Sequence, residues 1–377
     1  MSFCDPAAQN AAIPPLLESD VSDQDLRQTA LVLGATGGIG GELARQMRDA
    51  GWRVRALTRG TPPADEPHSE QRGGLQWLRG DAMCRDDVLA AARGCTVIVH
   101  AVNPPGYRRW AELVLPMIDN SIAAARAGGA TLVLPGTLYN HGPDAFPLLH
   151  EDSPQHPVTR KGAIRVAMEQ RLRQATEAVA GAPGQDGRRC RVLILRAGDF
   201  FGPRCGNSWF AQGLVQPGRP VRRILNPATA GVGHQWAYLP DVARTLLELL
   251  QRREQLPAFA SFHLGGHWDA DGRQMVQAIQ RVVQAQGGGL PRVHGFPWPL
   301  LRLASPFVTT LRELLEMRYL WRTPVRLDNR RLLATLGHEP HTPLDLAVLA
   351  TLQGLGCLPA AAQPAVATTV AAVRPAG

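Results

Sequence analysis

The hydrophobic positions of the chain form short apolar runs that alternate with longer amphipathic segments. TALVLG at 29–34 is a continuous apolar run of the kind that forms a buried strand. GIGGELARQMRDAG at 38–51 has its apolar residues at helical spacing and closes on a glycine, and WRVRALTR at 52–59 is the next apolar run. The order of strand, helix and strand predicts a βαβ unit with parallel strands.

The same alternation continues along the chain and weakens only after residue 205. Further strands are predicted at 75–78, 96–102, 131–136, 190–196 and 261–266. Further helices are predicted at 85–94, 110–129, from about 160 to 180, and at 241–254, 271–286, 310–321 and 343–356. We therefore expect an α/β fold: a Rossmann-type doubly wound parallel sheet with a smaller, mainly helical C-terminal substrate lobe.

This pattern also predicts the domain boundaries. The NAD(P)-binding Rossmann domain is expected at 29–205, with returning elements near 235–266. The substrate lobe is expected at 206–234 and 267–356. Residues 1–28 and 357–377 carry little patterned hydrophobicity and are predicted to be flexible tails.

Composition and charge exclude several classes of protein. The formal charge is +8, but the basic residues are spread along the chain and only 6% of residues are aromatic, which argues against nucleic acid as a partner. The six cysteines show neither metal-ligand spacing nor a disulfide framework, so we expect a cytoplasmic protein without a metal site. No run of ~18 apolar residues and no secretory signal is present, so no membrane partner is predicted.

A glycine-rich turn follows the first predicted strand. Gly34, Gly37 and Gly40 have GxxGxxG spacing between a strand and a helix. Such glycines permit a tight turn, a close approach of the backbone to a pyrophosphate and close packing of helix on strand. The predicted cofactor contacts of this segment are Gly34, Thr36, Gly37, Gly38, Ile39 and Gly40.

The end of the second predicted strand indicates which dinucleotide binds. An NAD site places an acidic side chain here for the ribose 2′-hydroxyl, but this chain has Thr58 followed by Arg59. A guanidinium suits a 2′-phosphate, so NADP(H) is favoured, while NAD(H) stays possible. The alternative is that Arg59 is an ordinary exposed arginine.

These motifs together resemble one enzyme family. GATGGIG at 34–40, LTRG at 57–60, RGDAM at 79–83, VIVHAVNPP at 97–105 and RAGDFFGP at 196–203 resemble the extended short-chain dehydrogenase/reductase family. That family includes nucleotide-sugar epimerases and dehydratases. The resemblance implies an NAD(P)-binding Rossmann domain, a C-terminal substrate lobe and a homodimer formed through the helices that flank the fifth strand.

The resemblance also implies roles for individual residues. Asp81 and its neighbour Ala82 correspond to the position that contacts the adenine, and Ala101 and Val102 to the strand end beneath the ribose and nicotinamide. Thr137 corresponds to the catalytic Ser or Thr, whose hydroxyl can hydrogen-bond a substrate oxygen.

The family's catalytic Tyr-x-x-x-Lys pair is replaced in this chain. The corresponding positions are Lys161 and Arg165, and Lys161 is the only lysine among 40 basic residues. Spacing of four puts both on one helical face, where the arginine charge would lower the pKa of the lysine and suit it to proton transfer. The alternative is a decayed motif. Tyr139 is a competing proton donor.

The substrate side of the predicted site is less well defined. Asn103 follows the fourth strand, and the resemblance places four more residues along the substrate pocket: Asn207, Trp209, His234 and Tyr238. In nucleotide-sugar enzymes of the family, the position of His234 usually carries an arginine that grips the diphosphate. Its replacement favours a smaller or more apolar substrate.

Three functions remain open from sequence. The first is an NADP-dependent oxidoreductase that acts on a small carbonyl or alcohol, with Thr137 orienting the oxygen and Lys161 managing the proton. The second is an NAD(P)-dependent epimerase or dehydratase of a sugar-like substrate. The third is a non-catalytic NADP-binding sensor or regulatory protein, which the loss of both signature residues would explain.

Overall fold

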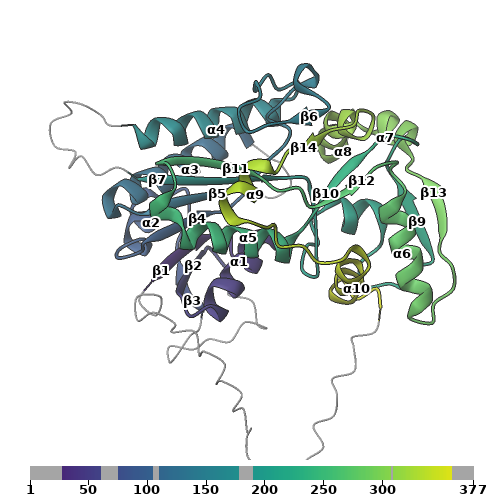
Figure 1. Cartoon of the computed structure of the whole chain (residues 1–377), viewed down its shortest axis with the longest axis horizontal. Coiled ribbons are helices and arrows are strands. Elements are labelled where there is room, and N and C mark those ends of the chain that lie inside the picture. The colour runs from purple at the N-terminus through teal and green to yellow at the C-terminus, as the bar shows by residue number, and fades with distance from the viewer. Residues whose placement is uncertain (1–27, 61–74, 105–109, 178–189, 307–308, 359–377) are drawn as a thin grey trace, which may run out of the picture.

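A parallel sheet with helices packed around it forms the left half of the molecule in Figure 1. The computed structural model describes residues 28–60, 75–104, 110–177, 190–306 and 309–358. Seven strands pair in the order β11-β7-β5-β4-β1-β2-β3, and all neighbours run parallel. Their bounds are β1 Thr29–Leu33, β2 Arg53–Thr58, β3 Leu75–Arg79, β4 Val97–His100, β5 Thr131–Thr137, β7 Arg191–Ala197 and β11 Phe259–His263.

Both faces of this sheet are covered by helices, as the continuous apolar strands require. Alternate residues of β1 enter two different cores: Val32 packs with α1 and α5, whereas Leu31 packs with α2, α3 and α4. The helices on the first face are α1 Gly38–Asp49, α5 Leu239–Gln251 and α9 Arg330–Leu336, and those on the second are α2 Arg85–Ala91, α3 Trp110–Gly128 and α4 Arg160–Thr176. The predicted doubly wound α/β fold is confirmed.

The strand order reverses at the centre of the sheet. From β1 the chain adds β2 and β3 on one side, then returns to add β4, β5, β7 and β11 on the other. The carboxyl ends of β1 and β4 therefore border the crevice in which open α/β sheets bind ligands. The predicted glycine turn and Ala101–Asn103 follow these two strands.

The C-terminal lobe combines helices with three short sheets (Figure 1). β10 His234–Tyr238 lies between β8 Asp199–Phe201 and β12 His267–Asp269, β9 Arg223–Asn226 pairs with β13 Arg292–Gly295, and β6 Leu148–Leu149 pairs with β14 Arg326–Leu327. The helices are α6 Gln274–Ala285, α7 Trp298–Ala304, α8 Thr309–Glu316 and α10 Leu344–Gly354. Short 3-10 or π turns lie at Pro143–Ala145, Phe210–Leu214, Arg253–Gln255 and Met317–Trp321.

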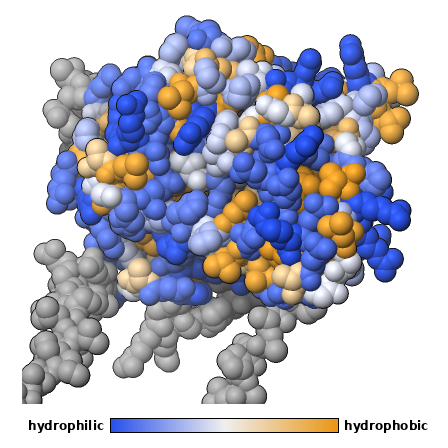
Figure 2. All heavy atoms as spheres, turned by 45° about the vertical axis from the view of Figure 1, so that its right-hand side comes forward, coloured by the Kyte–Doolittle hydropathy of each residue, from blue (hydrophilic) through white to orange (hydrophobic). Residues whose placement is uncertain are grey.

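An aromatic core fills this lobe, while part of its surface stays apolar. Phe201, Phe210 and Trp236 are almost fully buried in a core that α6 and α10 complete. Figure 2 shows hydrophobic residues in small groups among polar ones on the face that this lobe turns to the viewer. The large exposed apolar side chains of the lobe include Leu290, Val293, Leu300 and Leu303.

The expected tails lie mostly outside the described residues. Cys357, where the C-terminal tail was expected to begin, is only 3% exposed and belongs to the core of the lobe. The predicted start of the C-terminal tail at residue 357 was therefore too early by at least one residue, because Cys357 lies in one buried cluster with Leu352 and Leu355. Residues 1–27 and 359–377 are not described.

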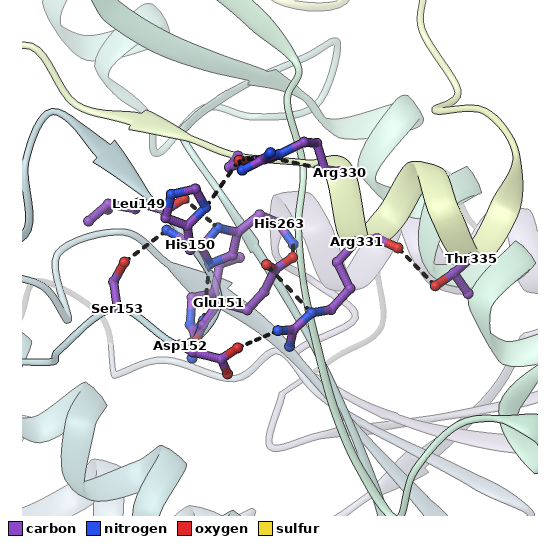
Figure 3. A network of polar contacts seen from close by, with 11 residues as sticks. Leu149, His150, Glu151, Asp152, Ser153, His263, Arg330, Arg331 and Thr335 are labelled. Carbon is purple, nitrogen blue, oxygen red and sulfur yellow. Dashed lines mark hydrogen bonds and ion pairs between the residues drawn. The ribbon is translucent and has the colours of Figure 1, made fainter.

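Ion pairs and a backbone hydrogen bond join residues 149–152, before α4, to the C-terminal part of the chain (Figure 3). Arg331 of α9 reaches the carboxylates of Glu151 and Asp152. The backbone amide of Asp328 donates to the Leu149 carbonyl over 2.8 Å. These contacts add to the β6–β14 pairing and hold the approach to α4 in place.

A buried ion pair joins α4 to β7. Arg196 donates from Nε and Nη2 to the two carboxylate oxygens of Glu169 over 3.1 and 2.7 Å. Burial alone would raise the pKa of Glu169, but the Arg196 guanidinium and Gln155 hold it below its usual range. The carboxylate is therefore ionised at neutral pH and accepts hydrogen bonds only.

We expect Glu169→Gln to destabilise the fold strongly, because it leaves the Arg196 charge buried without a counter-charge. The cost expected for breaking such a pair is about 3–5 kcal/mol. Urea unfolding followed by circular dichroism measures it. The matched control is Glu177→Gln, an exposed glutamate at the end of α4, which should change stability little. Equal unfolding midpoints for the two variants would contradict the structural importance of the pair.

Candidate functional site

The glycine turn after β1 is shaped by direct backbone contacts. Gly34 has a φ of +89°, and a Cβ there would lie 2.6 Å from the carbonyl carbon of Ala101. A Cβ on Gly40 would lie 2.3 Å from the Gly34 oxygen, and the Gly37 amide donates to that oxygen over 2.9 Å. Side chains are thus excluded at Gly34 and Gly40, as close packing of β1, α1 and the end of β4 requires.

The amino end of α1 has the properties of an anion site. Gly37 is the N-cap and supplies no side-chain hydrogen bond to the first turn of the helix. Thr36 and Gly37 are exposed, and Gly38 and Ile39 are half-buried. Uncapped amides and the helix dipole favour negative charge here, so the turn fits the pyrophosphate of a dinucleotide.

The residues expected at the adenosine end lie on the neighbouring strands. Thr58 ends β2, and Arg59 directly after it is exposed. Asp81 follows β3, where its Oδ1 accepts a hydrogen bond from the Met83 amide over 3.0 Å. Ala82 is buried beside Asp81. β2 and β3 end on the side of β1 away from β4, as the adenosine half of the site requires.

On the other side of the crevice, Arg165 of α4 reaches the end of β4. Its Nη2 donates to Asn103 Oδ1 over 3.1 Å, and its guanidinium lies 5.2 Å from the centre of the Trp110 ring. Arg165 is 6% exposed, and its Nε has no hydrogen-bond partner among the described residues. A buried charge with an open donor suits a polar ligand beside Ala101 and Val102.

Lys161 lies one helical turn before Arg165 and is 5% exposed. Thr159 caps the helix, since its Oγ1 accepts from the Gly162 amide over 3.0 Å. A Cβ on Gly162 would lie 2.4 Å from the carbonyl oxygen of Tyr139. The start of α4 thus packs directly on the loop after β5, which carries Tyr139, and Thr137 is the last residue of β5.

The Thr137 hydroxyl has a defined direction. Asn140 Nδ2 donates to Glu169 Oε1 over 2.8 Å, because an ionised carboxylate accepts only. The amide oxygen of Asn140 therefore faces Thr137 Oγ1 at 2.8 Å, and the threonine hydroxyl must donate to it. Thr137 then offers only lone pairs to a ligand, so it accepts a hydrogen bond from an alcohol or an ammonium rather than donating one to a carbonyl.

His100 at the end of β4 is a neutral neighbour of Arg165. Burial, and then the Arg165 charge, lower the pKa of His100 to about 3. Its Nδ1 lies 2.8 Å from Ser121 Oγ. Arg165, not His100, therefore carries the positive charge at this end of the crevice at neutral pH.

The four residues predicted for the substrate pocket lie in the C-terminal lobe. Trp209 packs edge-on against Trp321 at 5.3 Å between ring centres, and the buried Tyr238 packs against Phe201 at 5.3 Å. Asn207 is exposed and accepts from Gln212. His234 stacks on Trp321 with ring centres 3.7 Å apart, and its Nε2 lies 2.8 Å from Asp199 Oδ2. Their contact with substrate stays a prediction.

Sequence reasoning missed Asn140 and Glu169, which together orient Thr137. Glu169 follows Lys161 and Arg165 at the same spacing of four residues, so helical periodicity placed it on their face. Asn140 carried no signal in the sequence, because its role depends on a partner in a distant helix.

No helix in the described part of the chain is long and apolar enough to cross a membrane.

One curated protein matches part of this chain in sequence. The chain is 29% identical over 192 residues to a 3-diazoavenalumate denitrifying reductase from a Streptomyces species. That match covers 47% of this chain and 57% of the relative, so the chain matches only about half the length of this curated protein.

Two solved structures show the same fold. A UDP-glucuronic acid 4-epimerase from Bacillus cereus in complex with NAD superposes with a TM-score of 0.63 at 14% identity, covering 87% of this chain and 96% of that one. A UDP-glucose 4-epimerase from Thermus thermophilus, also in complex with NAD, superposes with a TM-score of 0.60 at 19% identity. The superposition covers 87% of this chain and 99% of that one.

The model of the NAD dependent epimerase/dehydratase family matches residues 30–265, more than half of the chain. That range contains the glycine turn, Thr137 at the end of β5 and the whole of α4. The chain belongs to the NAD dependent epimerase/dehydratase family.

Proposed function

We propose that this chain is an NADP(H)-dependent oxidoreductase that interconverts a small carbonyl compound and its alcohol, with Lys161 as the proton donor and acceptor. One observation carries the proposal: Lys161 and Arg165 are both buried, one helical turn apart, between the end of β4 and the loop after β5. Burying two cations costs free energy, and buried charged groups of this kind cluster at sites that bind charged ligands or transfer protons.

Lys161, Thr137 and Arg165 would each have a separate role in this reaction. Bound NADPH would supply a hydride to the carbonyl carbon. Lys161 Nζ gives a proton to the carbonyl oxygen, so that the product is the alcohol and the lysine is left neutral. Thr137 accepts a hydrogen bond from the ammonium or from the product hydroxyl, and Arg165 holds the ribose side of the site.

Arg59 is the basis for proposing NADP(H). It follows β2 directly and is exposed, where its guanidinium can meet a 2′-phosphate. The two epimerase structures of the same fold are complexes with NAD, so a preference for NADP(H) would distinguish this chain from them.

The second candidate is an epimerase or dehydratase, which the family and the two structural neighbours favour. The surroundings of His234 argue against a nucleotide sugar. Its ring is stacked on Trp321 and its Nε2 faces the Asp199 carboxylate, which would repel a diphosphate. A small substrate and a homodimer, with neither nucleic acid nor membrane as partner, stay predictions.

We expect Gly40→Ala to weaken NADPH binding more than tenfold, because the new Cβ would meet the Gly34 oxygen at 2.3 Å and push the turn open. Quenching of tryptophan fluorescence measures the dissociation constant. The control is Gly295→Ala in β13 of the C-terminal lobe, where a Cβ meets nothing within 4 Å. Unchanged affinity in Gly40→Ala would exclude this turn as the cofactor site.

We expect Lys161→Arg to lower turnover by about 10²–10⁴-fold, since arginine keeps the charge but does not release a proton. A panel of carbonyl compounds, monitored at the NADPH absorbance, first identifies a substrate. Tyr139→Phe is the matched variant and should keep most of the activity. Full turnover in Lys161→Arg would end the lysine hypothesis, and NADPH that binds but is never consumed would favour a sensor.

We expect Arg59→Ala to reduce the affinity for NADPH at least tenfold and to leave that for NADH nearly unchanged, because only NADPH carries the 2′-phosphate. Parallel titrations with both nucleotides measure the ratio. Equal affinities of the unmodified chain for NADPH and NADH would overturn the proposed preference.

A further inference from the structure

A second polar cluster lies at the amino end of α5, where three side chains of metal-ligating type meet. Asp241 belongs to the first turn of α5, His267 to β12 and His341 to the connection between α9 and α10. One ligand atom from each lies within 4.8 Å of the other two. The proposed mechanism uses none of these residues.

One ring nitrogen of His267 lacks a hydrogen-bond partner among the described residues. His267 is 8% exposed, and this nitrogen, Nε2, is buried. The centre of its ring lies 4.4 Å from that of His341. A buried imidazole nitrogen without a partner among the described residues is available to a metal ion, because histidine is a common metal ligand.

Asp241 holds the segment that carries His341 beside it. Its Oδ2 accepts from the Thr342 amide over 2.7 Å, and its Oδ1 accepts from the Thr342 hydroxyl over 2.8 Å. Arg244 also donates to Oδ1. A carboxylate has about four lone-pair positions, so one on Oδ2 stays available. The backbone beside His341 is thus held in place, and the His341 side chain is exposed.

We propose that Asp241, His267 and His341 bind a zinc ion, with water as the fourth ligand. Two imidazoles and a carboxylate form a donor set that suits Zn²⁺. Tetrahedral bonds of about 2.1 Å place ligand atoms roughly 3.4 Å apart. Because the three ligand atoms lie within 4.8 Å of one another, the cluster has to contract by up to about 1.4 Å, which the exposed His341 side chain allows. The ion would satisfy His267 Nε2 and tie the α9–α10 connection to the Rossmann domain.

Arg244 is the charged group that opposes a cation here. It contacts Asp241, donates to the Thr342 hydroxyl over 2.8 Å and is about half-exposed. Removing its charge should therefore strengthen zinc binding, whereas removing a ligand should weaken it. Opposite effects from neighbouring positions distinguish a specific site from loose surface binding.

The test is a zinc titration of the full chain, without a histidine tag and after treatment with a chelator, against a chromophoric competitor. We expect one Zn²⁺ per chain, at least tenfold weaker binding in His267→Gln and His341→Gln, and tighter binding in Arg244→Gln. Co²⁺ in place of Zn²⁺ should give the visible absorption of a tetrahedral site. The control is His338→Gln, an exposed histidine of the same connection that contacts Glu248 instead.

Two results would overturn the proposal. One is the absence of a stoichiometric zinc site, and the other is unchanged affinity in His341→Gln. Because His341 is exposed, its variant keeps the test valid even where substitution of the buried His267 impairs folding. The titration requires no catalytic activity, so its outcome is independent of the proposed oxidoreductase function.

Discussion

The ionised carboxylate of Glu169 is the interaction on which the candidate site depends. It accepts hydrogen bonds from Asn140 at 2.8 Å, from Gln155 at 2.7 Å and from the Arg196 guanidinium. These donors come from the loop after β5, the approach to α4, and β7. One buried charge thus sets the position of α4 relative to the sheet, and with it the position of Lys161 relative to Thr137.

The Glu169 carboxylate also determines the hydrogen-bond direction of the Thr137 hydroxyl, although it does not contact that hydroxyl. An acceptor-only carboxylate orients the Asn140 amide, and the amide oxygen accepts a hydrogen bond from the Thr137 hydroxyl. Arg196 extends the network to His263, whose Nδ1 faces the Leu149 carbonyl (Figure 3). Hydrogen bonds in such a chain support one another, so the site is pre-organised by residues that never meet a substrate.

Sequence alone predicted the sheet, most helices and the glycine turn, because strands buried on both faces and amphipathic helices leave clear patterns. It did not predict β13, whose residues are all exposed, or the seven-residue helices α7 and α9. In the site, Thr137, Lys161 and Arg165 followed from the resemblance. Asn140, and the grouping of Asp241 with His267 and His341, arise only when distant segments fold together.

The return of the chain at α9 affects how the molecule unfolds. Leu332 and Leu336 of α9 enter the core of the Rossmann domain, and Arg331 is bound to the approach to α4, yet α10 directly afterwards completes the lobe. Neither core is complete without a segment from this late part of the chain. The two cores should therefore lose their structure in one cooperative transition rather than melting independently.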